Sequence, residues 1–264
     1  MSELVAGTTV PQPTHAPIGL RRLRAGHALL RLLSRARIVE AEIRGLDDLV
    51  PAGGAVLDVG ASLGLYTIPL AHLVGAAGRV DSFEPQPRGY RAIRTLRRLT
   101  GAHRGSLHRV AVGAAPGHGA IAVPLARGLV PVFGHGHLTD GAAEPDGARL
   151  RRTETEIITL DAWVTSEGID RVAFIKMDVE GFEPAVIEGA ARTIARDLPT
   201  MLLEIEDRHL ARYGTDAATF TASILARWPE YRMLRWDGRR WVRAAAVDTR
   251  GNNYLFATLD ALPG

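Results

Sequence analysis

Cysteine is absent from the 264-residue chain, which excludes disulfide scaffolds, thiolate metal sites, iron–sulfur clusters and cysteine nucleophiles. No apolar run approaches the roughly 18 residues of a membrane span, and no charged-then-apolar leader opens the sequence. Residues 1–17 are polar and contain three prolines, and we expect a disordered tail there. These absences predict a cytoplasmic protein that works through acids, bases, a cofactor or recognition.

Lysine is almost absent as well: of 32 basic residues, only Lys176 is a lysine. The basic character therefore reflects a general preference for arginine, and the formal net charge is only +3. The arginine-rich stretch 21–37 contains no aromatic residue that could stack on a base. We expect no nucleic-acid partner.

Residues 18–50 are predicted to form a helical lead-in. Apolar residues recur near helical spacing among arginines from Ile18 to Arg44, which indicates one or two amphipathic helices. We favour a helix that packs on the domain and keeps a solvated basic face. A peripheral contact with a membrane surface or an acidic partner is the alternative.

Residues 51–264 alternate between strand and helix patterns, which is typical of parallel βαβ units and a doubly wound α/β fold. Strands are predicted at 55–60, 79–84, 106–112, 172–179, 201–205 and 253–259, helices at 65–74, 88–99, 160–166, 184–196 and 217–228, and a hairpin at 231–242 that turns at Asp237-Gly238. Glycine and proline interrupt this alternation over 114–154. Because long irregular segments in compact domains are often functional, we predict a variable insertion that forms a substrate lobe.

Acidic and glycine residues follow the first two predicted strands. The first strand carries Asp58 and ends in Gly60-x-x-x-Gly64, which differs from the G-x-G-x-x-G of dinucleotide binders. The second strand ends at Glu84, where a carboxylate can accept hydrogen bonds from a ribose diol. A cap on the helix after Pro85 is the alternative role for Glu84. Together these residues favour a nucleoside with a cationic, amino-acid-like tail, such as S-adenosylmethionine.

Four segments of the sequence resemble the FkbM family of S-adenosylmethionine-dependent methyltransferases: residues 55–67 (AVLDVGASLGLYT), 79–87 (RVDSFEPQP), 107–113 (LHRVAVG) and 155–190, which contains TLDAW and KMDVEGFE. The resemblance implies a class I methyltransferase (Rossmann-like) fold, with a mostly parallel seven-stranded sheet and an antiparallel last strand. It also implies methyl transfer to a hydroxyl of a natural product, sugar or glycolipid. The expected cofactor-binding residues are Asp58, Gly60, Ala61, Gly64, Glu84, Pro85, Val112 and Asp178.

The run from Lys176 to Gly181 places three charged residues at the end of a predicted parallel strand. Such strands are normally buried on both faces, so the charges are better explained as the lining of a ligand cleft. Strand periodicity places Lys176, Asp178 and Glu180 on one side. Lys176, the only lysine of the chain, is expected to belong to the catalytic site, where it holds the carboxylates rather than reacting. The alternative is an ion pair with Glu84, Glu180 or Glu204 that only aligns the strand ends.

Methyl transfer to an alcohol requires the hydroxyl to lose its proton, which calls for a base or a metal ion. Asp178 is the first candidate for the base, and Glu180 and His209 are alternatives. Mg²⁺ held by Asp178, Glu204 and Glu206 is possible on chemical grounds but not favoured, and no metal ligands are assigned. His135 and His137 are expected to be solvated loop residues rather than zinc ligands.

The sequence thus predicts an S-adenosylmethionine-dependent O-methyltransferase that acts on a small-molecule or glycolipid acceptor. Two alternatives stay open. A methyltransferase-like module could bind ligands without turnover, because a fold and a cofactor site do not prove catalysis. A Rossmann NAD(P) oxidoreductase is the second alternative, which the glycine spacing disfavours.

Overall fold

The computed structural model describes residues 18–102, 104–126, 130–131, 136–139, 149–248 and 251–262. The tail predicted at 1–17 lies outside this range. The predicted lead-in forms helix α1 (Ile18–Arg35) and the short 3-10 helix η1 (Ala41–Gly45). Among the described residues, no helix is both long and apolar enough to cross a bilayer.

The main sheet has eight strands in the order β12-β11-β13-β10-β9-β1-β2-β3. These are β1 (Ala55–Val59), β2 (Arg79–Phe83), β3 (Leu107–His108), β9 (Val172–Met177), β10 (Thr200–Glu204), β11 (Arg232–Trp236), β12 (Trp241–Arg243) and β13 (Asn253–Ala257). The five strands from β3 to β10 pair in parallel, and β13 runs antiparallel between β10 and β11. The predicted doubly wound α/β fold with an antiparallel last strand is confirmed.

The eighth strand corrects the predicted number of seven. The Asp237-Gly238 hairpin forms as expected, because the Asp237 carboxylate accepts hydrogen bonds from the backbone N–H groups of Arg239 and Arg240 at 2.8 and 2.9 Å. This closed turn brings β12 back against β11. The extra strand therefore extends the edge that carries β11.

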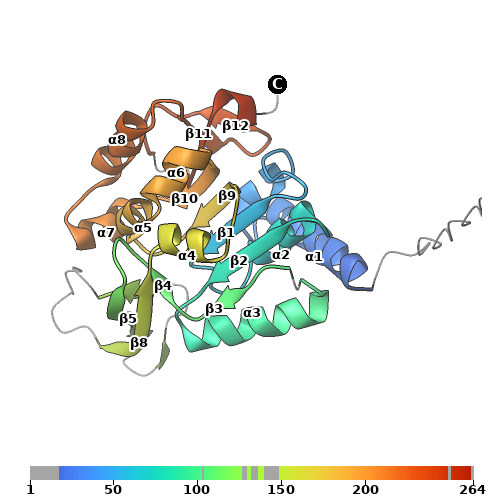
Figure 1. The fold of residues 1–264 in the computed structure, drawn as a ribbon, viewed down its shortest axis with the longest axis horizontal. Coiled ribbons are helices and arrows are strands. Elements are labelled where there is room, and N and C mark those ends of the chain that lie inside the picture. Colours follow the sequence, from blue (N-terminus) through green and yellow to red (C-terminus); the bar gives the residue numbers. More distant parts are fainter. Residues whose placement is uncertain are drawn as a thin grey trace, which may run out of the picture.

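Helices cover both faces of the main sheet (Figure 1). The apolar cluster on one face joins the sheet to α1, η1 and α2 (Thr67–Val74). The cluster on the other face joins it to α4 (Leu160–Ser166), α5 (Glu183–Gly189), α6 (Ala191–Asp197) and α8 (Ala217–Arg227). The remaining helices are α3 (Pro87–Thr100), α7 (Asp207–Leu210), η2 (Ala211–Tyr213) and η3 (Leu259–Ala261).

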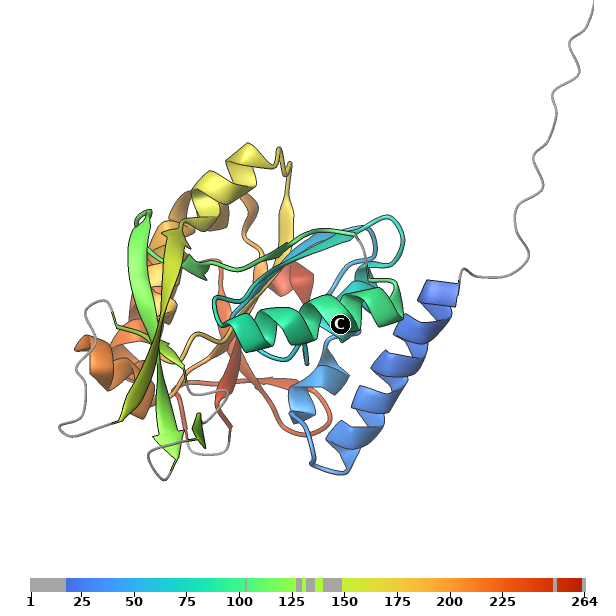
Figure 2. The ribbon, with the colours of Figure 1, turned by 90° about the horizontal axis from the view of Figure 1, so that it is seen from below.

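A second sheet lies beside the first, and the sequence did not predict it (Figure 2). It contains β4 (Ala111–Val112), β8 (Leu150–Ile158), β5 (Gly117–Ala126) and β6 (Val130–Pro131) in that order, with β7 (His137–Leu138) also paired to β5. The strand predicted at 106–112 is therefore wrong as one element. Its first half pairs with β2 and its second half pairs with β8.

Two further boundaries differ from the predictions. The helix predicted at 184–196 is divided at Ala190 into α5 and α6. The strand predicted at 172–179 ends at Met177, so Asp178 and Glu180 lie in the turn that follows it. Glu180 adopts a left-handed conformation with φ of 58°, which redirects the chain toward α5.

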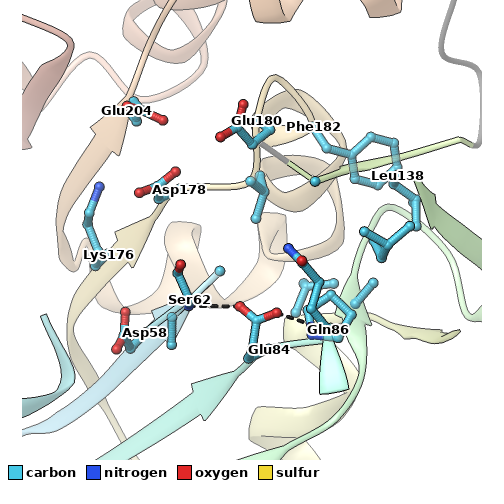
Figure 3. A pocket seen from close by; sticks show the side chains of 18 of the residues that line it. Asp58, Ser62, Glu84, Gln86, Leu138, Lys176, Asp178, Glu180, Phe182 and Glu204 are labelled. Atoms are coloured by element: carbon cyan, nitrogen blue, oxygen red, sulfur yellow. Dashed lines mark hydrogen bonds between the residues drawn. The ribbon is translucent and has the colours of Figure 1, made fainter. Parts of the chain in front are cut away.

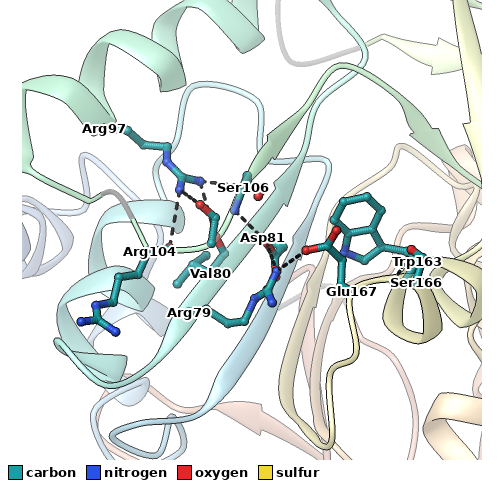
Figure 4. Close-up of polar contacts among 10 residues, drawn as sticks. Arg79, Val80, Asp81, Arg97, Arg104, Ser106, Trp163, Ser166 and Glu167 are labelled. Carbon is teal, nitrogen blue, oxygen red and sulfur yellow. Dashed lines mark hydrogen bonds and ion pairs between the residues drawn. The ribbon is translucent and has the colours of Figure 1, made fainter.

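A buried ionic network fixes the β2–β3 edge of the main sheet (Figure 4). The Asp81 carboxylate accepts hydrogen bonds from the Arg79 side chain and from the backbone N–H of Ser106, both at 2.7 Å. From α3, the Arg97 guanidinium donates to the carbonyl oxygens of Ser106 and Gly105. These contacts hold α3 and the chain before β3 against β2, and so position the residues that follow β2.

Candidate functional site

A cavity of about 390 Å³ lies beyond the carboxyl ends of β1, β2, β9 and β10 (Figure 3). This is the edge where ligands bind in open parallel sheets. The second sheet also contributes to the lining, through Ile121, Gly136 and Leu138. Three described residues of the insertion predicted at 114–154 therefore line the cavity, and part of the insertion lies outside the described residues.

The turn after β1 brings backbone close to the cavity. Gly60 has φ of +77°, and a Cβ atom there would lie 1.8 Å from the carbonyl oxygen of Asp178. Gly60 and Ala61 donate backbone hydrogen bonds to the Phe83 carbonyl at 3.0 and 3.1 Å. Only glycine allows this approach of the β1 and β9 turns, which places Gly60 and Ala61 in the cavity wall.

The second predicted glycine has a different position. Gly64 has φ of +83°, and a Cβ atom there would contact Leu96 and Ile93 of α3 at 3.0 and 3.4 Å. It is not among the residues that line the cavity. Its place in the G-x-x-x-G motif is therefore explained by the packing of α3 on the turn.

Glu84 lies at the end of β2 with 3% of its surface exposed. Its two carboxylate oxygens accept hydrogen bonds from the backbone N–H groups of Ser62 and Gln86, each at 2.7 Å (Figure 3). Burial raises the pKa of Glu84 to about 7, and these two hydrogen bonds oppose the shift. Each oxygen keeps a free lone pair, so the carboxylate is held in one orientation and can still accept from a diol.

The helix after β2 leaves room for this carboxylate. A Cβ atom at Gly89 in α3 would lie 2.6 Å from the Ser62 carbonyl oxygen and 2.8 Å from Cγ of Glu84. The sequence analysis did not single out Gly89. A glycine inside a helix is unfavourable by about 1 kcal/mol relative to alanine. A glycine within the predicted helix was therefore the sequence feature that could have identified this position.

Asp58 and Lys176 are neighbours across the β1–β9 pair and are both almost fully buried. The Thr67 hydroxyl donates to the Asp58 carboxylate at 2.6 Å. Burial nevertheless raises the pKa of Asp58 to about 6. Thr67 is a second residue that the sequence analysis missed.

Lys176 does not use a carboxylate as its direct hydrogen-bond partner, in contrast to the predicted ion pair. Its Nζ donates to the side-chain oxygen of Asn253 at 2.9 Å and lies 4.8 Å from the centre of the Tyr66 ring. Asn253 in turn donates to Glu40 at 3.0 Å, and Tyr66 donates to the same carboxylate. Burial would lower the pKa of Lys176, but the surrounding carboxylates, Asp178 first, give a net rise.

The far side of the cavity is strongly acidic. Asp178, Glu180 and Glu204 extend toward it from the ends of β9 and β10 (Figure 3). Burial and the neighbouring Asp178 carboxyl raise the pKa of Glu204 to about 10. The same two causes raise the pKa of Glu180 to about 8. At neutral pH these carboxyls hold protons that exposed glutamates would release.

His209 and Arg212 contact Glu180 from the α7–η2 segment. His209 Nε2 lies 3.2 Å from a Glu180 carboxylate oxygen, and Arg212 donates to the Glu180 carbonyl oxygen at 3.3 Å. His209 also lines the cavity, as the sequence analysis expected of a candidate base. Glu180 and His209 therefore act as one unit at the rim of the acidic side.

The described residues contain one group that could hold a metal ion, formed by Glu180, Glu204 and His209, whose ligand atoms all lie within 4.8 Å of one another. This set differs from Asp178, Glu204 and Glu206, the combination that the sequence analysis considered and did not favour. A mixed nitrogen and oxygen set suits a transition metal better than Mg²⁺, which prefers oxygen ligands. Glu206 instead accepts hydrogen bonds from Arg208 and Asn252.

The other predicted residues fall into two groups. Pro85 and Val112 line the cavity together with Ala111 and Phe182 and make one wall apolar. His137 lies in β7 with 3% of its surface exposed, so the expectation of a solvated loop histidine is wrong for it. His135 lies outside the described residues.

Glu183 is a further site residue that the sequence analysis quoted in a motif without a role. It is almost fully buried and accepts a hydrogen bond from the Val179 backbone N–H at 2.9 Å. Burial raises its pKa to about 7. Glu183 therefore closes the turn that carries Asp178 and Glu180.

Comparison with known proteins connects this cavity to a family of enzymes. The family model for the methyltransferase FkbM domain matches residues 58–229. This range includes the glycine-containing turn after β1 and the acidic turn after β9. No protein with a curated description matches the chain.

One solved structure supports the fold. The chain is similar to a methyltransferase FkbM from Methylobacillus flagellatus KT, with 20% identity over 90% of this chain and a TM-score of 0.50. It spans 57% of the length of that protein. It is also similar to Aeropyrum pernix fibrillarin in complex with S-adenosyl-L-methionine, at 15% identity over 91% of this chain and 76% of the other, with a TM-score of 0.42.

Proposed function

The chain belongs to the FkbM methyltransferase family, and on that basis we propose that it transfers the methyl group of S-adenosylmethionine to a hydroxyl of a natural product, sugar or glycolipid. The cofactor, when bound, supplies an electrophilic methyl group on a sulfonium ion. Three features of the cavity fit such a cofactor. They concern its ribose diol, its flat nucleobase and its cationic amino-acid tail.

Glu84 supports recognition of a ribose. Its carboxylate is fixed by two backbone N–H groups and keeps lone pairs for two hydroxyl donors. The apolar wall that includes Pro85, Val112 and Phe182 suits a nucleobase. The carboxylate of Asp58, near the narrow turn at Gly60, suits the ammonium group of an amino-acid tail.

The observation that carries hydroxyl methylation is the carboxyl pair formed by Asp178 and Glu204. Because burial and the neighbouring Asp178 raise the pKa of Glu204, we assign Glu204 as the protonated member of the pair and Asp178 as the base. It accepts the hydroxyl proton, while Glu204 stabilises the arrangement as a hydrogen-bond donor. Lys176 lies behind the pair and offsets its negative charge from a fully buried position.

Co-purified ligand and turnover test this proposal separately. Mass spectrometry of the denatured protein is expected to show S-adenosylmethionine or S-adenosylhomocysteine. Incubation with methyl-labelled cofactor and a panel of hydroxylated acceptors is expected to give a labelled ether. Bound cofactor without a methylated product across the panel would support the binding-module alternative, and a bound nicotinamide cofactor would overturn the proposal.

A further inference from the structure

The outer face of α1 carries an apolar stripe that is exposed among the residues that the structure describes. Leu29 and Leu32 have 54% and 60% of their surfaces exposed, and Ile38, just after the helix, has 68%. They are three of the six large apolar side chains that are exposed among the described residues. Single exposed leucines need no explanation, but Leu29 and Leu32 lie one helical turn apart on the same face, and a continuous apolar face marks an interaction surface.

Helical geometry aligns the stripe along the helix. Exposed residues at i, i+3, i+4, i+7 and i+11 share one face of a helix, and here they are Ala25, Ala28, Leu29, Leu32 and Ala36. The opposite face packs on the domain through Leu23 and His27, which are buried. α1 thus has two apolar faces. One packs against the domain, and the other is exposed to solvent.

The inner face of α1 is firmly attached to the domain, so the outer face is presented by a fixed scaffold. His27 contacts the Asp47 carboxylate at 3.1 Å, and Arg31 pairs with the same carboxylate. Arg22 donates to the Leu99 carbonyl oxygen of α3 at 3.1 Å. Figure 2 shows α1 along the outer edge of the molecule.

Arginines border the outer stripe, and no acidic residue occurs in the helix. Arg21, Arg24 and Arg35 are exposed on one side of it, and Arg37 follows at its end. A leucine-bearing face bordered by cations matches an anionic lipid surface, where leucines enter the acyl boundary and guanidinium groups stay among the headgroups. Pairing with a second copy of the chain would instead bring the same arginines together.

We propose that α1 docks this protein on anionic membranes through Leu29, Leu32 and Ile38, with Arg21, Arg24 and Arg35 contacting lipid headgroups. The docking surface adjoins the cavity along the chain, because Glu40 lines the cavity two residues after Ile38. The proposed membrane contact and one cavity wall therefore lie within three residues of each other in the chain. Membrane binding does not depend on the proposed methyl transfer and can be tested without an acceptor.

Vesicle flotation of the full chain tests the proposal. We expect binding to vesicles of phosphatidylcholine mixed with phosphatidylglycerol, weak binding to phosphatidylcholine alone, and a loss of binding as salt is raised. The double variant L29Q/L32Q is expected to bind the mixed vesicles at least about tenfold more weakly. The triple variant R21Q/R24Q/R35Q is expected to lose a similar factor and most of the salt dependence.

Matched controls separate docking from general surface effects. L259Q removes an equally exposed leucine elsewhere, and R239Q/R240Q removes exposed charges from the β11–β12 turn. Both controls are expected to bind as wild type does, and all variants are expected to keep the wild-type melting temperature. Absence of wild-type binding to anionic vesicles, or unchanged binding of L29Q/L32Q, would overturn the proposal. A shift from dimer to monomer in L29Q/L32Q without vesicle binding would also overturn it and assign the stripe to self-association.

Discussion

The carbonyl oxygen of Asp178 occupies the space where residue 60 would carry a Cβ atom. The ideal Cβ position at Gly60 lies 1.8 Å from that oxygen, and the φ angle of +77° is itself one that favours glycine. The turns after β1 and β9 therefore meet in direct backbone contact. This contact holds the β1 turn and the acidic side of the cavity at a fixed separation.

Gly60→Ala is expected to lower both stability and cofactor affinity, because Asp178 must move to make room for the alanine side chain. Gly75→Ala is the control: Gly75 also has a positive φ, of +65°, but a Cβ atom there meets nothing within 4 Å. Backbone strain alone is expected to cost the control about 1–3 kcal/mol of unfolding free energy. Urea denaturation and titration with S-adenosylhomocysteine measure the two effects. Equal losses of stability in both variants, with wild-type affinity in each, would show that the contact is unimportant.

Glu84→Ala is expected to weaken binding of S-adenosylhomocysteine by about 10- to 150-fold, through the loss of charge-assisted hydrogen bonds to the ribose. Isothermal titration calorimetry measures this affinity. Glu154→Ala removes an exposed carboxylate from β8 and is the control for a change of charge alone. Unchanged affinity in a folded E84A protein would remove Glu84 from the cofactor site.

Cofactor binding is expected to weaken as the pH falls through about 7. Burial raises the pKa of Glu84 to about 7 in the free protein, so below that pH its carboxyl gains a proton and loses acceptor capacity. The dissociation constant of S-adenosylhomocysteine, measured by calorimetry from pH 8 down to about pH 6, follows this titration. A Glu84→Gln variant is expected to lose this dependence, and an equal dependence in E84Q would assign the titration to another group.

Asp178→Asn is expected to slow the chemical step by a factor on the order of 10² or more while changing cofactor affinity much less. The amide preserves the shape of the side chain but cannot accept the hydroxyl proton as a carboxylate does. Single-turnover kinetics with a methyl acceptor separates the chemical step from binding. A wild-type rate with a wild-type pH profile would move the role of base to Glu180 or His209.

The acidic side of the cavity is expected to make the cofactor-free protein less stable as the pH rises. Burial and Asp178 raise the pKa of Glu204 to about 10, above its ordinary value of 4.5. The folded state thus holds a proton that the unfolded chain has released, and stability falls with pH between these two values. Glu204→Gln mimics the protonated side chain and is expected to match wild type near pH 5 and to melt several degrees higher at pH 9. Parallel melting curves across this range would refute the assignment.

The strand and helix pattern predicted most of the main sheet because each parallel strand is a short apolar run next to a helical stretch. Asp58, Glu84 and Asp178 could be assigned to one cavity from sequence, since the ends of parallel strands meet at one edge. The interruption of the third strand could not be predicted. Leu107 pairs with β2 and Ala111 with β8, and the choice of partner is made by tertiary packing.

Contacts between distant segments were also beyond the reach of sequence patterns. Asn253 donates to Glu40 and accepts from Lys176, and these three residues belong to the last strand, the lead-in and the fourth parallel strand in chain order. No local periodicity relates them. The sequence placed Lys176 near the carboxylates, but it could not show that the hydrogen-bond acceptor of its ammonium group is the Asn253 amide.

β4 pairs with β8 and forms one edge of the second sheet. Ile121 and Leu138 line the cavity from β5 and β7, which lie on the other side of β8. Glu84 and the turn after β1 therefore belong to a different stretch of sequence from Ile121 and Leu138. Substitutions in the outer strands change their part of the cavity lining without altering the turns after β1 and β2.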